Sequence, residues 1–206
     1  MANPYITPTE MMQRLDAVNT SWTAAERAAL EGAIEAVSRK VDEVTSQHFY
    51  RMTATLEFTP TSAGVLVLPH PLVSVTTLKH SVDTARTYDQ TWATTDYDLW
   101  PYNASNFGKP YTELRVTPAG TQSFPVGATK SVELAAVWGW PTVPEPIKQA
   151  VALEASRMMQ MGQNPSGVVA ASSAAGFTAV RIAPQLHPTA MALIRPYMVD
   201  LMAGTF

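Results

Sequence analysis

The side chains that most often carry metal or acid–base chemistry are scattered in this sequence. Its four histidines stand at positions 48, 70, 80 and 187. No two of them have helical or zinc-finger spacing, and no carboxylate completes a ligand set with them. Asp96 and Asp98, with the earlier Asp89, come nearest to a divalent-ion cluster, but no glycine-bearing calcium loop accompanies them. The sequence therefore predicts no metal site and no cofactor.

Nucleophilic and phosphate-binding motifs are also missing from the sequence. A serine nucleophile on a strand-to-helix turn needs the pattern Gly-x-Ser-x-Gly, whereas Ser166 stands in a Pro-Ser-Gly turn with no strand pattern before it. Neither a phosphate loop nor a dinucleotide fingerprint occurs. The chain has no cysteine, which excludes disulfides and thiolate chemistry. We therefore expect a protein that is not an enzyme.

One segment, residues 97–103, combines aromatic and polar side chains in a way that can bind ligands. It reads Tyr-Asp-Leu-Trp-Pro-Tyr-Asn, and aromatic rings interleaved with polar groups can stack on sugars or bases. No lysine or arginine stands beside it in the sequence, which favours packing over ligand binding. A carbohydrate-binding module built on Trp100 and Tyr102 remains an alternative function.

Charge is scarce in this chain of 206 residues, and it is unevenly distributed. Charged residues make up 15% of the sequence, against about 25% in an ordinary soluble protein. Depletion of charge is typical of the buried centre of a protein interface, so the composition predicts a subunit covered by neighbours. The segment 151–206 holds six of the ten methionines, which suit adaptable contact surfaces. Its only charged residues are Glu154, Arg157, Arg181, Arg195 and Asp200.

The net charge of −3 bears on the classes of partner that the chain can bind. A weakly acidic chain has no large electrostatic attraction for phosphates, so we expect no tight DNA binding. No stretch of about 18 apolar residues occurs, and we expect no membrane partner. The N-terminus lacks a basic region followed by an apolar run, so secretion by that route is not expected.

The elements that must carry these residues begin with helices over residues 1–50. Thr7 and Glu10 form a capping box that predicts a short helix to about Val18, and Thr23 and Glu26 form a second one. The longer helix, 24–47, has apolar residues at steps of three and four: Leu30, Ile34, Val37, Val41 and Val44. Its opposite face is predicted to be solvated and carries Arg27, Glu31, Glu35, Arg39, Asp42 and Glu43.

Residues 51–140 change to a period of two and predict an antiparallel β region. The first alternating segment lies around Leu56 and Phe58. Six further candidate strands are 64–68, 72–80, 87–92, 97–100, 113–116 and 131–138. Short sequential strands joined by polar turns favour antiparallel pairing, so we expect a small sheet or sandwich. In the last strand, one face is formed by Val132, Leu134, Ala136 and Trp138.

Prolines mark the return to helix after this β region. Pro141, Pro144 and Pro146 stop the preceding strand, and a proline in the first turn of a helix costs no hydrogen bond. A helix over 147–161 is therefore predicted. Its apolar face, formed by Ile147, Val151, Ala155 and Met158, is expected to pack on the helix of residues 24–47.

The sequence thus predicts an α+β fold in a single domain of residues 1–206. N- and C-terminal helices, including that of segment 141–163, form a helical core into which the β region is inserted. Residues 164–206 read as a flexible linker of small residues followed by a C-terminal arm. In that arm Pro188 starts a helix that Pro196 kinks.

Four segments carry a family resemblance. Residues 66–78 contain Leu-Pro-His-Pro-Leu-Val-Ser-Val, 96–99 read Asp-Tyr-Asp-Leu, 139–147 read Gly-Trp-Pro-Thr-Val-Pro-Glu-Pro-Ile, and 177–182 read Phe-Thr-Ala-Val-Arg-Ile before a Pro-Tyr pair. In this order they resemble the head-tail connector, or adaptor, proteins of long-tailed bacteriophages and gene transfer agents. The end of the long helix departs from the family's Thr-Gly-Arg-x-Phe pattern at Ser46, Gln47 and His48.

The resemblance implies a structural protein of the virion neck, assembled in the host cytoplasm. It implies a homo-oligomeric ring of about twelve copies that closes by rotation at the portal vertex. The ring would dock below the portal protein, meet a downstream neck or tail protein, and let DNA pass through its channel without sequence-specific binding. Another neck ring, a stopper or a tail terminator, shares the composition and remains an alternative.

In this family the C-terminal segment commonly reaches onto the portal. The resemblance therefore implies a docking surface at Phe177, Val180, Arg181, Ile182, Ile194, Arg195, Pro196, Tyr197, Met198 and Leu201. We expect such an arm to be mobile in the free subunit and ordered on the portal. Deleting residues 177–206 is then expected to abolish portal attachment while the core stays folded.

Overall fold

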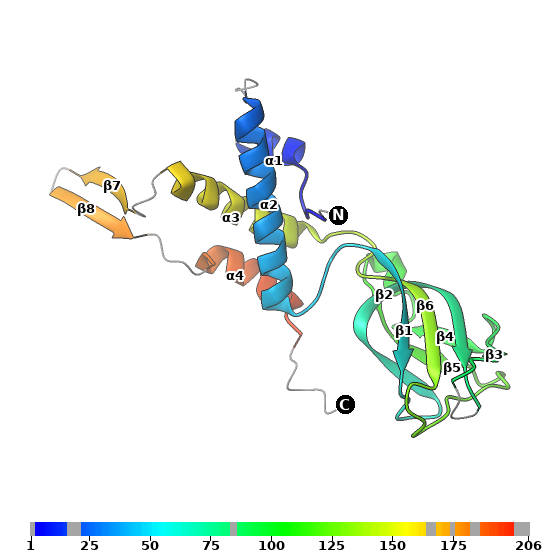
Figure 1. The fold of residues 1–206 in the computed structure, drawn as a ribbon. Helices are drawn as coiled ribbons and strands as arrows, with labels where there is room; N and C mark the ends of the chain where they lie inside the picture. Colours follow the sequence, from blue (N-terminus) through cyan, green and yellow to red (C-terminus); the bar gives the residue numbers. More distant parts are fainter. Residues whose placement is uncertain are drawn as a thin grey trace. The chain divides into compact units, whose positions relative to one another are not determined.

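The computed structural model describes residues 3–15, 22–82, 86–163, 168–173, 176–181 and 186–199. The chain divides into a helical unit, Met1–Ser46 with Val143–Phe206, and a β unit, Gln47–Thr142 (Figure 1). The β unit is inserted between the N-terminal and C-terminal helices, which confirms the predicted α+β class.

The helices of the helical unit begin where the sequence predicts, except that the helix predicted from residue 147 begins at Glu145. They are α1 (Pro8–Leu15), α2 (Ala24–Thr45), α3 (Glu145–Gln163), α4 (Pro188–Ile194) and the 3-10 helix η2 (Arg195–Tyr197). Both capping boxes are formed, because the N–H groups of Glu10 and Glu26 donate to the hydroxyls of Thr7 and Thr23. Helix α1 was expected to reach Val18; its described span is Pro8–Leu15, and residues 16–21 lie outside the described part.

Helices α2 and α3 pack against each other, as predicted. At the end of α2, Thr45 is buried in place of Val44, and its hydroxyl donates to the carbonyl of Val41 at 2.8 Å. The rest of the predicted α2 face is buried at Leu30, Ile34, Val37 and Val41. The facing residues of α3, Ile147, Val151 and Ala155, are fully buried.

Helix α4 belongs to the helical core. It packs on α3, and its residues Ala190 and Ile194 are both 0% exposed. Part of the segment predicted as a C-terminal arm, Pro188–Ile194, therefore packs on α3. Deleting residues 177–206 removes part of this core as well as any docking arm.

Two strands lie between α3 and α4, one in the predicted flexible linker and one at the start of the predicted C-terminal arm. Strand β7 (Val168–Ser173) pairs antiparallel with β8 (Gly176–Arg181), with Val168 opposite Arg181 and Ser173 opposite Gly176. The two strands form a sheet of their own. The expected linker over residues 164–175 thus contains a strand that the small residues did not reveal.

The β unit is one antiparallel sheet with the strand order β1-β6-β2-β5-β4, to which β3 adds by pairing with β2. Its strands are β1 (Met52–Phe58), β2 (Val65–His80), β3 (Gln90–Thr91), β4 (Tyr97–Trp100), β5 (Tyr111–Val116) and β6 (Val132–Trp138). The predicted strands 64–68 and 72–80 form the single strand β2. Its pairing with β5 shifts register between Val67 and Leu72, where Pro69 and Pro71 lack the N–H groups of a regular ladder.

The core of the β unit follows the predicted alternation. On β6, Val132, Leu134, Ala136 and Trp138 are at most 1% exposed, and they alternate with half-buried residues. The indole N–H of Trp138 donates to the carbonyl of Ala54 on β1 (2.9 Å). Gly139 follows with φ +106° and donates its N–H to the carbonyl of Pro71 at 2.7 Å. This close junction joins the end of β6 to β2.

Candidate assembly surfaces

The ten residues predicted to dock on a portal fall into three groups in the structure. Ile194 is fully buried in the helical unit and offers no surface. Arg195, Pro196 and Met198 are exposed around η2, and Tyr197 is half-buried. Phe177, Val180 and Arg181 lie on β8, whereas Ile182 and Leu201 lie outside the described residues.

Backbone contacts at both ends hold α4 and η2 in place. At the start of α4 the N–H of His187 donates to the carboxylate of Glu154 on α3 (2.5 Å), a residue that is 7% exposed. Glu154 also pairs with Arg157, one turn further along α3 (3.4 Å). After η2 the N–H of Val199 donates to the carbonyl of Thr45 at the end of α2 (3.1 Å). The exposed residues of η2 therefore stand on a fixed base.

An apolar groove runs between α2 and α3, with a volume of about 570 Å³. Small residues of α2 form one side, and the methionines of α3 form the other. Met158 was predicted on the buried face of α3, but it is 46% exposed. The lining residues are Ala25, Glu26, Ala29, Gly32 and Ala33 with Met158 and Met159. The sequence indicated the methionines as a contact surface but not the α2 side of the groove. Alanines in a helix reflect a high helix propensity and do not show which face of the helix is exposed.

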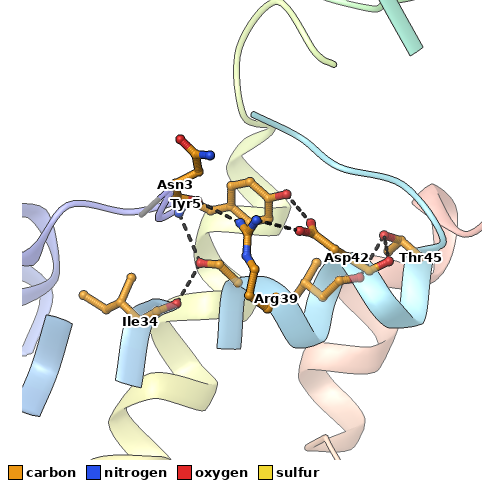
Figure 2. Close-up of polar contacts among 8 residues, drawn as sticks. Asn3, Tyr5, Ile34, Arg39, Asp42 and Thr45 are labelled. Atoms are coloured by element: carbon orange, nitrogen blue, oxygen red, sulfur yellow. Dashed lines mark hydrogen bonds and ion pairs between the residues drawn. The ribbon is translucent and has the colours of Figure 1, made fainter. Parts of the chain in front are cut away.

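The N-terminal segment is fastened to α2 by polar contacts (Figure 2). The N–H of Tyr5 donates to the hydroxyl of Ser38 (3.2 Å), which donates to the carbonyl of Ile34 (2.7 Å). The Tyr5 hydroxyl donates to the carboxylate of Asp42. A buried hydroxyl and a buried backbone N–H are thus both satisfied.

Arg39 extends this network. Its guanidinium donates to the carbonyl of Asn3 (2.8 Å), pairs with Asp42 (3.1 Å) and lies 5.4 Å from the centroid of the Tyr5 ring. Arg39 and Asp42 were predicted to be merely solvated, which the structure corrects. Tyr5 and Ile6 are 2% and 1% exposed, because the N-terminal segment covers this face of α2.

We expect Tyr5→Phe to destabilise the helical unit by about 1.5 kcal/mol at neutral pH. This is the lower end of the contribution of a hydrogen bond to a charged group. Burial raises the pKa of Asp42, and the Tyr5 hydroxyl and Arg39 partly oppose this. Acidification through the raised pKa neutralises the carboxylate, so the difference from the parent chain should shrink. Urea unfolding followed by helical circular dichroism at two pH values measures this difference in stability.

Tyr111→Phe, which loses an exposed hydrogen bond to Ser105, is the control. Equal stabilities of the two variants would contradict the network.

His80 and Trp92 form a buried polar pair in the β unit. The Trp92 indole N–H donates to Nδ1 of His80 (2.7 Å), and His80 is 7% exposed. Burial lowers the pKa of His80, although the charge of Asp89 raises it in part. The imidazole is therefore neutral in the folded state, because a protonated Nδ1 could not accept this bond.

The stability of the β unit should consequently depend on pH. The folded pKa of His80 lies below its ordinary value of 6.5, so the unfolded chain takes up the proton first. The stabilisation is complete above about pH 6.5 and declines as the pH falls through the folded pKa. Urea unfolding followed by tryptophan fluorescence from pH 7.5 to about 5 measures it, and His80→Gln should flatten the decline. Stability that increases over this range on acidification would contradict the assignment.

The aromatic segment around Trp100 is packed against a cation that the local sequence does not reveal. Arg115 on β5 lies 3.9 Å from the centroid of the Trp100 ring and pairs with Glu113 (2.8 Å). Tyr102 meets Trp100 edge-on, with ring centroids 4.8 Å apart. No lysine or arginine adjoins residues 97–103 in the sequence, but the pairing of β4 with β5 brings Arg115 next to Trp100. One face of Trp100 is therefore covered by Arg115, which leaves less of the ring for a sugar.

A cleft of about 460 Å³ lies beside this segment. Tyr102 is 52% exposed, and its hydroxyl donates to Asp98 (3.2 Å). Trp100 is not part of the lining. The lining residues are Ser74, Val75, Thr94, Tyr97, Asp98, Leu99, Tyr102, Asn103 and Tyr111.

In the described part of the chain, the carboxylates and histidines do not gather into a metal centre. Asp96 accepts the N–H of Ala93 (2.9 Å). His48 and His70 come together, with ring centroids 5.9 Å apart, although their sequence spacing gives no sign of it. Within the described residues no group of three or more potential ligands could hold a metal ion. Among the helices described, none is long and apolar enough to cross a bilayer.

Comparison with solved structures reveals a shared fold. The chain is similar over 97% of its length to 93% of a chain in the neck of an empty gene transfer agent particle computed with C6 symmetry, at 22% identity and a TM-score of 0.57. A chain in the native neck, computed with C12 symmetry, matches at 22% identity and a TM-score of 0.52, covering 99% of this chain and 98% of that one. No protein-family model matches the chain, and no curated protein sequence matches it significantly.

A third match has the same extent. A chain from the virion of a native gene transfer agent particle shares 22% identity, with a TM-score of 0.56, and the alignment covers 97% of this chain and 93% of that chain. Both units are therefore included in the similarity, because neither unit alone accounts for 97% of the residues.

Proposed function

We propose that this chain is a structural subunit of the neck of a tailed-phage-like particle, and that it acts in the virion as the adaptor ring at the portal vertex. The observation that carries the proposal is the fold similarity over 97% of the chain to subunits of gene transfer agent necks. Those necks were computed with C6 and C12 symmetry, which favours a closed homo-oligomeric ring here too. DNA would pass through the centre of this ring.

Composition and surface features support a role in assembly over catalysis. The charged fraction of 15% suits a subunit that neighbours cover on two sides. The groove between α2 and α3 offers small residues and an exposed methionine, which can admit a neighbouring chain closely. Because the similar chains are subunits of particle necks and virions, we assign a structural and not an enzymatic function.

The portal-docking surface is proposed to include Arg195, Pro196 and Met198, together with the residues of β8. These three residues are exposed on the fixed base of η2, so they can contact a partner without unfolding α4. Ile194 contributes by holding α4 on α3. The resemblance of residues 66–78 and 139–147 to adaptor motifs favours this ring over a stopper or a terminator.

Binding to the cognate portal tests the proposal. We expect the double variant Arg195→Ala, Met198→Ala to weaken co-sedimentation with portal rings at least about tenfold, as the loss of two interface anchors usually does. Val126→Ala, at a 55% exposed position of the β unit, is the matched control and should bind like the parent chain. A parent chain that does not bind portal rings would contradict the adaptor role.

A carbohydrate-binding module remains the second candidate because of the cleft beside Tyr102. Its lining combines three tyrosines with Asp98 and Asn103, the kinds of groups that hold a sugar. Tyr102→Ala should abolish saccharide binding if the cleft has this function. The adaptor proposal predicts no chemical-shift change in the cleft when mono- and disaccharides are added to the parent chain.

A further inference from the structure

The β7–β8 hairpin is an incomplete sheet. Its strands pair only with each other in the described structure, so each has one unpaired edge. In an antiparallel pair, alternate residues direct their N–H and C=O groups away from the partner strand. A two-stranded hairpin is marginally stable in water, and further strands or a packed helix normally complete it.

The hairpin also lacks the devices that keep sheet edges from pairing. From Val168 to Val180 the sequence contains no charged residue and no proline. The edge strands of the β unit differ, because β1 carries Glu57 and β4 carries Asp98. Charges and prolines are the usual protection of an exposed edge. An unprotected pair of edges is therefore expected to be covered by other strands.

A second copy of the same hairpin fits these edges. Strands β7 and β8 run in opposite directions. When β7 of one copy lies beside β8 of the next, the antiparallel alternation continues around a ring and closes without a free edge. A partner of different sequence would have to supply its own strands to every copy.

We propose that the β7–β8 hairpins of adjacent copies pair edge to edge and form a continuous antiparallel β-barrel within the ring. The inference rests on the ring proposed above. Because residues 168–180 carry no charge, both faces of the barrel are uncharged except near Arg181. Such a barrel presents little positive charge to retain DNA phosphates. Edge pairing uses backbone groups, so the side chains of β8 remain available to a portal.

Cysteine cross-linking in assembled particles tests the pairing, because the chain has no cysteine of its own. Ala170→Cys on β7 and Ala179→Cys on β8 are register partners within one hairpin. In single-cysteine chains mixed in equal amounts, a short bismaleimide can join them only between copies. We expect heterodimers to exceed either homodimer at least about fivefold, since β7 edges then face β8 edges. Particles with Ala170→Cys alone are the matched control.

The outcomes separate the pairing from the ring. If the chain is present in the neck but heterodimers do not exceed homodimers, the edge pairing is overturned and the adaptor function stands. If the chain is absent from the neck, both fail. Should the cysteine variants not assemble, hydrogen exchange on unmodified particles decides. A barrel protects every backbone amide of 168–173 and 176–181 from exchange, whereas an unpaired hairpin leaves alternate amides unprotected.

Discussion

Replacing Gly139 by alanine is expected to destabilise the β unit by at least about 3 kcal/mol, because it combines a backbone clash with a left-handed conformation. An added Cβ would lie 2.0 Å from the carbonyl oxygen of Tyr50 and 2.9 Å from its carbon. These atoms belong to the backbone just before β1, whose first residue Met52 pairs with Trp138. No rotamer change can relieve the contact. Either the end of β6 or the start of β1 must move.

Tryptophan fluorescence during urea unfolding measures this effect. Four of the five tryptophans, at positions 92, 100, 138 and 140, lie in the β unit. Two alanine variants are matched controls. Gly64→Ala meets no atom within 4 Å and should change stability by less than about 0.5 kcal/mol.

The second control separates the cost of a positive φ from the cost of the steric clash with Tyr50. Gly127 has φ +78° and also has nothing within 4 Å of an added Cβ, so its alanine variant should cost only about 1–2 kcal/mol. If Gly139→Ala costs no more than Gly127→Ala, the close approach of Tyr50 to Gly139 is contradicted.

Ending the chain after residue 185 is expected to abolish the cooperative unfolding of the helical unit. The truncation removes Ala190 and Ile194 from the core, and the loss of one buried isoleucine side chain alone costs about 2–5 kcal/mol. It also removes the N–H of His187 from the buried carboxylate of Glu154. A loss of this size is comparable to the whole stability of a small domain.

Helical circular dichroism during thermal unfolding measures the result of truncation. A chain ending after Val199 is the control, because it keeps α4, η2 and the bond from Val199 to Thr45. It should unfold with a Tm close to that of the parent chain. Tryptophan fluorescence should show the β unit still folded in both truncated chains. A cooperative helical transition in the chain ending at residue 185 would show that α4 is dispensable, as a separable arm requires.

Local sequence signals predicted the elements that depend on local physics. The capping boxes at Thr7 and Thr23 fixed where two helices begin, and the period of two in Val132–Trp138 identified the buried face of β6. In each case the residues that set the structure are neighbours along the chain. The insertion of a β region between helices followed from the same changes of period.

Features that depend on contacts across the chain could not be predicted in this way. The helical pattern places Asp42 on the solvated face of α2. In the structure it is covered by Tyr5, which stands 37 residues earlier in the sequence. The stacking of Arg115 on Trp100 needs the pairing of β4 with β5. The β7–β8 hairpin consists largely of small residues, whose pattern shows neither the helical period of 3.6 nor the strand period of two clearly.

For the candidate assembly surface, sequence resemblance indicated a region but not its internal division. Burial separates Ile194, which holds α4 in the core, from Arg195 and Met198, which are exposed around η2. The spacing of residues around Pro196 does not reveal that division, because it depends on how α4 packs on α3.

Cryo-electron microscopy of the intact particle neck, reconstructed with imposed and then relaxed rotational symmetry, tests the adaptor function most directly. We expect a closed ring of this chain directly beneath the portal, with Arg195 and Met198 against the portal and the β7–β8 hairpins in the ring interior. A ring further down the neck would indicate a stopper or a terminator. Absence of this chain from the portal vertex would contradict the proposed function.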